Sequence, residues 1–223
     1  LAFTFLVIFE VSLPLIISGY SPVLVTLLSA VFIILISILL IYGFNKKSKT
    51  AMISILLSVI VALVISSVFI KLTGLTGLAE EEVLFLSDIF IQQEKFSGLL
   101  LAAFVLGSLG ILDDVVLTQI SAVEQLKIAD PKQTNLEIYK KAMEIGADHI
   151  ASMINSLFLA YTGASHFLLF LIKTKTPPFT NILDTLNNEI VATEIVRTFS
   201  GSIGLILAIP LSTYIACYYF YRK

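Results

Sequence analysis

The stretch PVLVTLLSAVFIILISILLIYG at residues 22–43 carries no charged side chain and is long enough to cross a lipid bilayer as one helix. One apolar run of comparable length precedes it, and several follow it along the chain. We predict membrane-spanning helices, with ends accurate to a few residues, at 1–19, 22–43, 50–72, 97–121, 149–171 and 194–220. The pattern therefore predicts an all-α integral membrane protein of about six helices.

The composition supports this class of protein. Of the 223 residues, 57% are hydrophobic and 13% are charged, and the mean hydropathy is +0.98. A soluble domain carries about 25% charged residues, so a water-soluble globule is excluded. Six helices leave no room for a separate soluble catalytic domain, and we expect residues 1–223 to form a single polytopic membrane domain. Because Leu1 is not Met and already lies in an apolar run, we expect the sequence to begin within a longer protein.

Charge and cysteine content narrow the function classes. The net charge of −2 gives no reason to expect nucleic acid as a partner. Cys217 is the one cysteine of the sequence, which excludes an intramolecular disulfide.

Basic residues predict the orientation in the membrane. The short connection at 43–49 contains Lys46, Lys47 and Lys49, and Lys and Arg near membrane ends are retained on the cytoplasmic side. Alternation then places the segment 123–148 and the C-terminus inside as well. With this orientation nine basic residues lie inside and five outside. The C-terminus is therefore predicted to be cytoplasmic.

The segment 123–148 is predicted to be an amphipathic connection of two short pieces. Asp130-Pro131 stops the first piece, and Thr134 with Glu137 fits a capping box that begins the second. On the outer side, 79–93 opens with three Glu residues and is expected to lie along the interface, whereas 174–188 contains Pro177-Pro178 and is expected to be a turn-rich loop.

The helix at 97–121 carries two neighbouring acids. A stripe of small and polar residues follows steps of three or four along it: Ala103, Gly107, Gly110, Asp114, Thr118 and Ser121. Asp113 lies about 100° away round the helix, so both acids cannot face the same narrow seam, and we predict that Asp114 points inward. An intramembrane carboxylate is costly and indicates an ion or proton site. Alternatively, Asp114 accepts hydrogen bonds at a helix break after the glycines.

The helix at 149–171 repeats this pattern. Its stripe is predicted to face protein and consists of Asp148, Ser152, Asn155, Ser156, Leu159, Gly163 and His166. Asn155 either tunes the acidic site or bridges helices by hydrogen bonding. His149 and His166 are expected near opposite ends of the span and form no metal site.

The last helix enters the membrane through Glu194 and Arg197. These two either pair with each other at a spacing of three residues, or Arg197 serves as counterion for a carboxylate on the helix at 97–121 or 1–19. Gly201 and Gly204 continue the stripe and, with Gly107, Gly110 and Gly163, are expected to let helices pack closely. Glu10, close to Pro14, belongs to the same acidic cluster or marks a kink.

Several motifs are absent from the sequence. It lacks a phosphate-binding loop, a zinc-protease motif and a nucleophile elbow, so we expect no metal, no cofactor and no enzymatic activity. An intramembrane aspartyl hydrolase is a third, weaker reading, because Gly110-Ile-Leu-Asp113 lacks a glycine directly before the aspartate. Helices 22–43 and 50–72 carry only small hydroxyls, which indicate close packing.

Three motifs in order carry a resemblance to a family: GSLGILDD at 107–114, NSLFLAYTG at 155–163, and NEIVATEIVR at 188–197 followed by Gly201, Gly204 and Pro210. Over essentially its whole length the chain resembles the YibE/F-like family of bacterial membrane proteins. It departs at Ala147 and Glu124, where the family tends to have Arg and Asn. The resemblance implies a multi-pass protein of the bacterial cytoplasmic membrane. In arrangement the chain is also similar to the membrane half of SecD/SecF and RND permeases, in which a helix-4 aspartate takes part in proton coupling and two six-helix halves pair.

The leading hypothesis is a permease or half-transporter subunit that couples ion or proton movement to transport. Asp114 is its protonatable group, with Asp113, Asn155, Glu194, Arg197 and Glu10 as the other candidate residues. The alternative is a non-catalytic membrane subunit that scaffolds a larger complex. In either case the expected partners are the lipid bilayer and a second copy or a related six-helix protein.

Overall fold

In the computed structural model, which describes residues 2–79, 83 and 94–221, every regular element is a helix. The elements are α1 (Ala2–Val7), a π-helical turn η1 (Ile8–Ser12), α2 (Leu13–Ile17), α3 (Pro22–Tyr42), α4 (Lys46–Thr73), α6 (Glu94–Ala129), α7 (Asn135–Ala164), α8 (His166–Lys173), α9 (Ile182–Leu186) and α10 (Glu189–Tyr221).

Four of these helices, α3, α4, α6 and α10, are long and apolar enough to cross a membrane, with mean hydropathies of 3.1, 2.9, 2.1 and 1.7 over their most apolar windows. Helices α7 and α8 make a fifth span if they are taken together, although they are bent by 69°. The predicted class, an all-helical multi-pass membrane protein, is confirmed with four or five spans among the described residues.

The first predicted helix, 1–19, differs from a regular span. Residues Ala2–Ile17 form a shorter apolar helix that contains the π-helical turn η1. Pro14 lacks a backbone N–H and disturbs the regular bonding of the preceding turn. Ser12 fills the irregular turn: its hydroxyl hydrogen bonds with the carbonyl oxygen of Val7 at 3.2 Å and with the hydroxyl of Ser29 on α3 at 2.7 Å.

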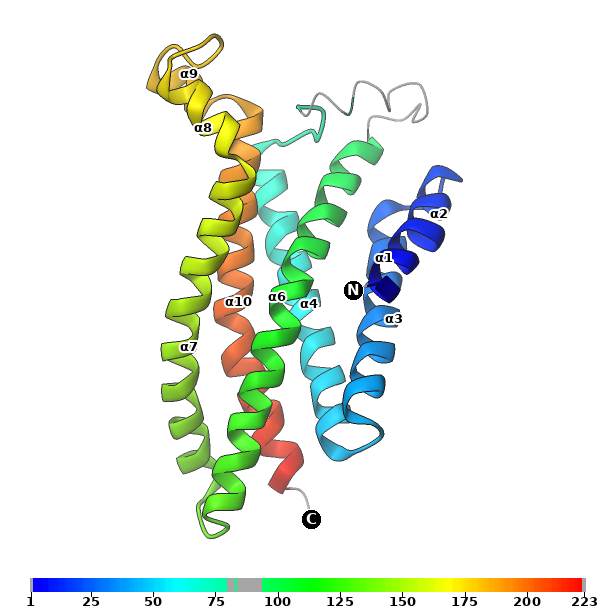
Figure 1. Cartoon of the computed structure of the whole chain (residues 1–223), viewed down its shortest axis with the longest axis vertical. Coiled ribbons are helices and arrows are strands. Elements are labelled where there is room, and N and C mark those ends of the chain that lie inside the picture. The colour runs from blue at the N-terminus through cyan, green and yellow to red at the C-terminus, as the bar shows by residue number, and fades with distance from the viewer. Residues whose placement is uncertain (1, 80–82, 84–93, 222–223) are drawn as a thin grey trace.

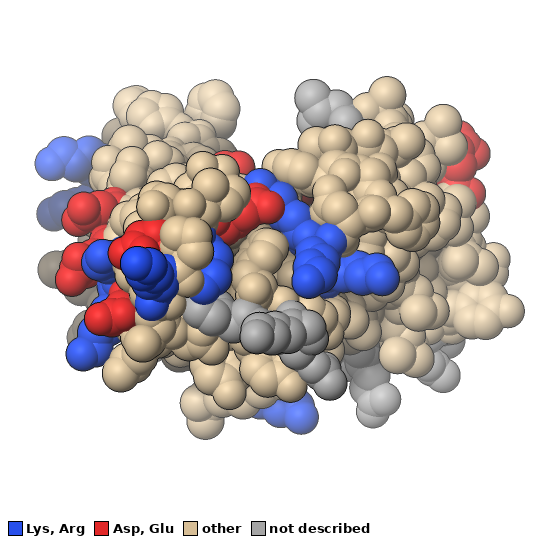
Figure 2. Space-filling model, turned by 90° about the horizontal axis from the view of Figure 1, so that it is seen from below, with Lys and Arg blue, Asp and Glu red and all other residues tan. Residues whose placement is uncertain are grey.

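The helices form a bundle around α10, which packs against α4, α6 and α7 (Figure 1). Helix α6 lies in front of α4 and α10 in this view, α7 lies at one edge, and α3 with α1 and α2 lies at the other. The α3–α4 turn, the α6–α7 turn and the end of α10 meet at the bottom of the figure. We call this the basic end because it gathers Lys46, Lys47, Lys49, Lys127 and Lys132, and Figure 2 looks onto it.

The two pieces of the predicted amphipathic connection at 123–148 are continuous with the long helices on either side. Helix α6 continues without a break to Ala129, and α7 already begins at Asn135, so most of the segment extends the two long helices. The stop at Asp130-Pro131 and the capping box of Thr134 with Glu137 are confirmed. Asp130 accepts hydrogen bonds from the side chain of Gln133 and the backbone of Lys132, which hold the pKa of its carboxyl below the ordinary value.

The predicted span at 149–171 is displaced along the chain. Helix α7 ends at Ala164, and Ser165, which is not helical, turns the chain into α8. His149 therefore lies about 20 Å inside α7, and its position near an end of the membrane span stays a prediction. The segment 174–188 has the expected Pro177-Pro178 turn and adds the short helix α9, which Asn181 caps. Of the segment 79–93, all but Ala79 and Val83 lie outside the described residues.

Small residues fill the contact between α4 and its neighbours. Ser54, Ser58 and Ser66 of α4 are buried, as expected for close helix packing. At Gly204 of α10, an added Cβ atom would lie 3.3 Å from the Cβ of Ala62 on α4. The core of the bundle thus depends on side chains too small to keep the backbones apart.

Candidate functional site

The small and polar stripe of α6 lies on the surface of the chain. Ala103, Gly107, Gly110, Asp114 and Thr118 are all exposed. Helix α6 instead packs on α4 and α10 through its opposite, apolar face, which includes the fully buried Val105, Leu112 and Val116. The prediction that Asp114 points inward is therefore wrong. Asp113, a third of a turn away, is the half-buried acid of the two.

The stripe of α7 also faces outward, so the protein that it is predicted to face is not another helix of the described part of this chain. Its members Asp148, Ser152, Asn155, Ser156, Leu159, Gly163 and His166 are all exposed. The face that α7 turns to the bundle contains Ile138, Ala142, Gly146 and Leu157. Apolar and small residues on that face pack more closely than the polar ones, and this packing decides the rotation of the helix.

Both stripes face the same side of the molecule. Helix α6 has α4 and α10 behind it in Figure 1, so its stripe points toward the viewer. Helix α7 contacts α6 near Ala142 and α10 near Leu157, and its stripe lies on the remaining front side. We call the exposed residues Ala103, Gly107, Gly110, Asp114, Thr118, Asp148, Ser152, Asn155, Leu159 and Gly163 the α6–α7 face.

A buried hydrogen bond fixes the register of the two helices. The side-chain Nε2 of Gln119 donates to the carbonyl oxygen of Ala142 at 2.6 Å, and a Cβ at Gly146 would lie 3.0 Å from the side-chain oxygen of Gln119. Because the helices run antiparallel with the same rise, this contact places Asp114 at the depth of α7 between Asp148 and Ser152. The acids and the hydroxyl and amide groups of the face therefore lie in one layer.

Three polar side chains of the α6–α7 face are unpaired among the described residues. In the part of the chain that the structure describes, the side chains of Asp114, Ser152 and Asn155 have no hydrogen-bond or ion-pair partner. Asn155 thus does not bridge helices inside one chain. In addition, the Nε2 atom of the half-buried His149 has no partner among the described residues.

Glu194 and Arg197 form the predicted pair of neighbouring turns. Their side chains meet at 3.0 Å, which is the first of the two alternatives that the sequence left open. The guanidinium of Arg197 also lies 5.4 Å from the ring centre of Phe104 on α6. The second carboxylate oxygen of Glu194 is buried without a partner among the described residues. This cluster stands near the end opposite the basic end, away from Asp114.

Tyr161 of α7 connects this cluster to two of the predicted packing glycines. Cβ atoms added at Gly107 and Gly201 would lie 3.5 and 3.7 Å from its hydroxyl oxygen. Tyr161 and Glu194 also line a cavity of about 250 Å³ between α7, α8 and α10. Gly204, where an added Cβ atom would lie 3.3 Å from the Cβ of Ala62, serves close packing within the chain, whereas Gly107 and Gly201 are in ordinary contact distance of Tyr161.

Gly110 and Gly163 have a different environment. A Cβ atom added at either position would meet no atom within 4 Å. Neither glycine is needed for close packing inside the chain, so their predicted packing role stays a prediction for contacts with another chain.

Glu10 is exposed and lies in the π-helical turn η1. It contacts neither Asp114 nor Arg197, since α1 and η1 pack on α3. The structure therefore favours the interpretation that Glu10 marks an irregular helical turn over the interpretation that it belongs to an acidic cluster.

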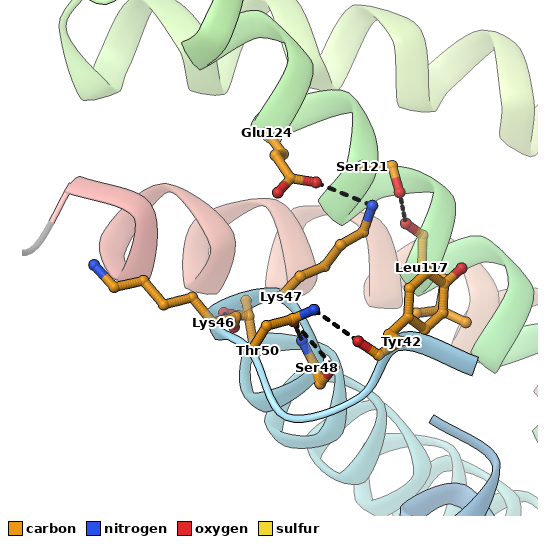
Figure 3. Close-up of polar contacts among 9 residues, drawn as sticks. Tyr42, Lys46, Lys47, Ser48, Thr50, Leu117, Ser121 and Glu124 are labelled. Atoms are coloured by element: carbon orange, nitrogen blue, oxygen red, sulfur yellow. Dashed lines mark hydrogen bonds and ion pairs between the residues drawn. The ribbon is translucent and has the colours of Figure 1, made fainter. Parts of the chain in front are cut away.

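Two polar contacts were missed in the sequence. Gln119 is 2% exposed and also donates to the hydroxyl of Thr213 at 2.7 Å, so one amide joins α6, α7 and α10. At the basic end, Lys47 forms an ion pair with Glu124 at 3.0 Å and lies over the ring of Tyr42, as Figure 3 shows. The signal for Gln119 was its position as a polar residue on the apolar face of α6. For the pair of Lys47 and Glu124, the spacing of the sequence offered no signal.

Among the described residues, no three His, Cys, Asp or Glu side chains come close enough to hold a metal ion. The long apolar helices define a multi-pass membrane protein, and one of these helices carries Asp113 and Asp114. The model of the YibE/F-like protein family matches residues 1–222, and the chain belongs to this family, as its motifs predicted. No curated protein and no solved structure matches the chain.

Proposed function

We propose that the protein is a permease or half-transporter subunit that couples the movement of protons or another ion to transport, with Asp114 as the group that gains and loses the ion. The observation that carries the proposal is a carboxylate at mid-depth of a membrane-spanning helix, exposed on the chain surface.

The depth of Asp114 follows from the basic end. The Lys47–Glu124 ion pair marks where polar side chains of α4 and α6 meet there. About 15 Å of helix separates Glu124 from Asp114, which is half of a hydrocarbon core about 30 Å thick. A charged carboxylate at that depth costs roughly 2.5–3.5 kcal/mol unless water or protein solvates it. Asp114 is therefore stable either protonated or beside a donor, and a switch between these states is what coupling requires.

The other candidate residues have supporting roles in this proposal. Arg197 pairs with Glu194 at 3.0 Å and balances its charge in this proposal. Asp113 is half-buried and can hold a second proton. Asn155 lies on the α6–α7 face and supplies both a donor and an acceptor.

A pH jump on a solid-supported membrane tests the role of Asp114 without knowledge of the substrate. The purified chain in lipid should give a transient current when the pH changes, and Asp114→Asn should reduce the current about tenfold. Asp130→Asn removes the same charge outside the apolar helices and serves as the matched control, with an unchanged current. A wild-type current from a correctly inserted Asp114→Asn protein would contradict the proposal.

A second candidate function is a membrane subunit that scaffolds a larger complex. The exposure of the whole α6–α7 face favours it, because a partner protein could cover the unsatisfied groups. Extraction from native membranes in lipid nanodiscs separates the two functions. A different protein in stoichiometric amount supports the scaffold, whereas the chain without a different partner supports the permease. Neither function gives the chain an enzymatic activity.

For location, we infer a bacterial cytoplasmic membrane with the basic end and the C-terminus in the cytoplasm, from the excess of Lys at that end. Cysteines at Lys49 and Thr176, in a chain with Cys217→Ser, test the orientation, because both positions are exposed. An impermeant thiol reagent should label Thr176→Cys and leave Lys49→Cys unlabelled in intact cells. The reverse pattern would overturn the orientation. The neighbouring Ser48 is unsuitable for the labelling cysteine because it is 1% exposed.

A further inference from the structure

The α6–α7 face combines hydrogen-bond donors and acceptors that form no hydrogen bond with each other among the described residues. Asp114 on α6 accepts hydrogen bonds, and Ser152 and Asn155 on α7 donate them. The two helices lie side by side (Figure 1), and the stripe residues of both are exposed. Since the bilayer core offers no hydrogen bonds, a further protein surface would satisfy these groups there.

A second copy of the chain meets this requirement by symmetry. Two copies inserted in the same direction are related by a two-fold axis along the membrane normal, and such an axis keeps every residue at its own depth. The register set by Gln119 places Asp114 at the depth between Asp148 and Ser152. Rotation by the two-fold axis therefore brings Asp114 of each copy to the depth of the partner's Ser152, and also of the partner's Asp148, as an isologous interface requires.

We propose that the α6–α7 face binds the same face of a second copy, with α6 of each chain against α7 of the other and Asp114 hydrogen-bonded to the partner's Ser152 and the partner's Asn155. The proposal deepens the proposed function and rests on its choice of Asp114 as the site. The site is incomplete in one chain, because both donors come from the partner.

The shape of the face fits such a contact. Gly110 lies on the stripe about one turn from Asp114, and a Cβ atom added there would meet no atom of its own chain within 4 Å. Gly163 on α7 is equally open. Without a hydrophobic drive between helices in lipid, close backbone approach at small residues and hydrogen bonds between helices supply the association.

Disulfide cross-linking between two differently tagged copies tests the interface. Each copy carries Cys217→Ser and one new cysteine, Asp114→Cys in one and Ser152→Cys in the other. This pair should cross-link in native membranes at least tenfold more than a control pair of Leu57→Cys with Ser152→Cys. Leu57 is an exposed residue of α4, about 15 Å from Lys47 and so at the depth of Asp114. Equal yields for the two pairs would overturn the proposal.

A second pair and a mass measurement cover the case in which Asp114→Cys fails to fold. Gly110→Cys with Asn155→Cys should also cross-link, since Gly110 has free space around it. In lipid nanodiscs the wild-type chain should have twice the mass of 24.5 kDa, and Gly110→Leu should reduce it to one chain. Val64→Leu, an exposed change on α4, should leave the mass at two chains. A wild-type mass of one chain, or a heteromer with a different protein, would overturn the second copy as partner.

These measurements separate the interface from the proposed function. Cross-links together with an undiminished pH-jump current in Asp114→Asn would remove ion coupling and leave the interface. A current that depends on Asp114, measured in a protein with the mass of one chain, would support ion coupling and remove the interface.

Discussion

Small residues spaced at three or four line two regions of the molecule, the contact of α4 with α10 and the α6–α7 face. The first region is buried within the chain, and the second is exposed. Both show small residues at steps of three or four along apolar helices. On α4 and α10 these residues are buried against each other, as at Ala62 and Gly204. On the α6–α7 face they are exposed and accompanied by Asp114 and Asn155. A small-residue stripe thus indicates a close contact without telling whether the contact lies within the chain or between chains.

The sharpest test of this difference uses two glycines. At Gly204 an added Cβ lies 3.3 Å from the Cβ of Ala62, and a leucine has no room. We expect Gly204→Leu to cost about 3 kcal/mol, because overpacking forces two backbones apart. Thermal unfolding in detergent, followed by gel filtration, should show the loss. Gly110→Leu in the same assay should leave the unfolding temperature of the single chain unchanged. Equal losses of stability in the two variants would contradict the conclusion that Gly204 packs within the chain and Gly110 does not.

The next largest effect concerns the buried amide. Gln119→Leu removes both hydrogen bonds that join α6 to α7 and α10, and hydrogen bonds between membrane helices contribute about 0.6 kcal/mol each. We expect a loss of about 1 kcal/mol in the free energy of unfolding in detergent. Asn155→Leu is the matched control, because its amide has no partner within the described part of the chain. A larger loss for Asn155→Leu in the single chain would show that its outward position is wrong.

A smaller effect is expected at the basic end. Lys47 and Glu124 pair at 3.0 Å, with side chains that are 19% and 28% exposed. Partly exposed ion pairs contribute about 0.5 kcal/mol, and salt weakens them. A double-mutant cycle with Lys47→Met and Glu124→Gln should give a coupling of that size, lower at 1 M salt. A coupling of zero at low salt would mean that the contact in Figure 3 does not stabilise the fold.

The smallest effect lies in the core of α4. The hydroxyl oxygen of Ser54 is buried without a hydrogen-bond partner among the described residues. Ser54→Ala removes a polar group that gains nothing from burial, so stability should change by less than about 0.5 kcal/mol and in the stabilising direction. Ser58 donates to the carbonyl oxygen of Ser54 at 2.8 Å, and Ser58→Ala serves as the comparison, with no gain in stability. A clear destabilisation by Ser54→Ala would indicate a partner for its hydroxyl.

The order of residues along the chain predicts the class of protein and several local contacts. Apolar runs, the Asp130-Pro131 stop and the Thr134–Glu137 capping box act locally, through transfer free energies and backbone hydrogen bonds, and the structure has each of them. The Glu194–Arg197 pair likewise depends only on neighbouring turns of one helix. Interactions of this range can be predicted from residue order.

The direction in which each stripe faces depends on packing between helices and is seen only in the tertiary structure. Periodicity places Asp114, Gly110 and Gly107 on one side of α6, but that side could equally face α10 or lipid. The choice follows from the better packing of Val105, Leu112 and Val116 against α4 and α10, which is a property of three helices together. The contact between Gln119 and Thr213 depends on the same packing, because it joins residues far apart in the chain.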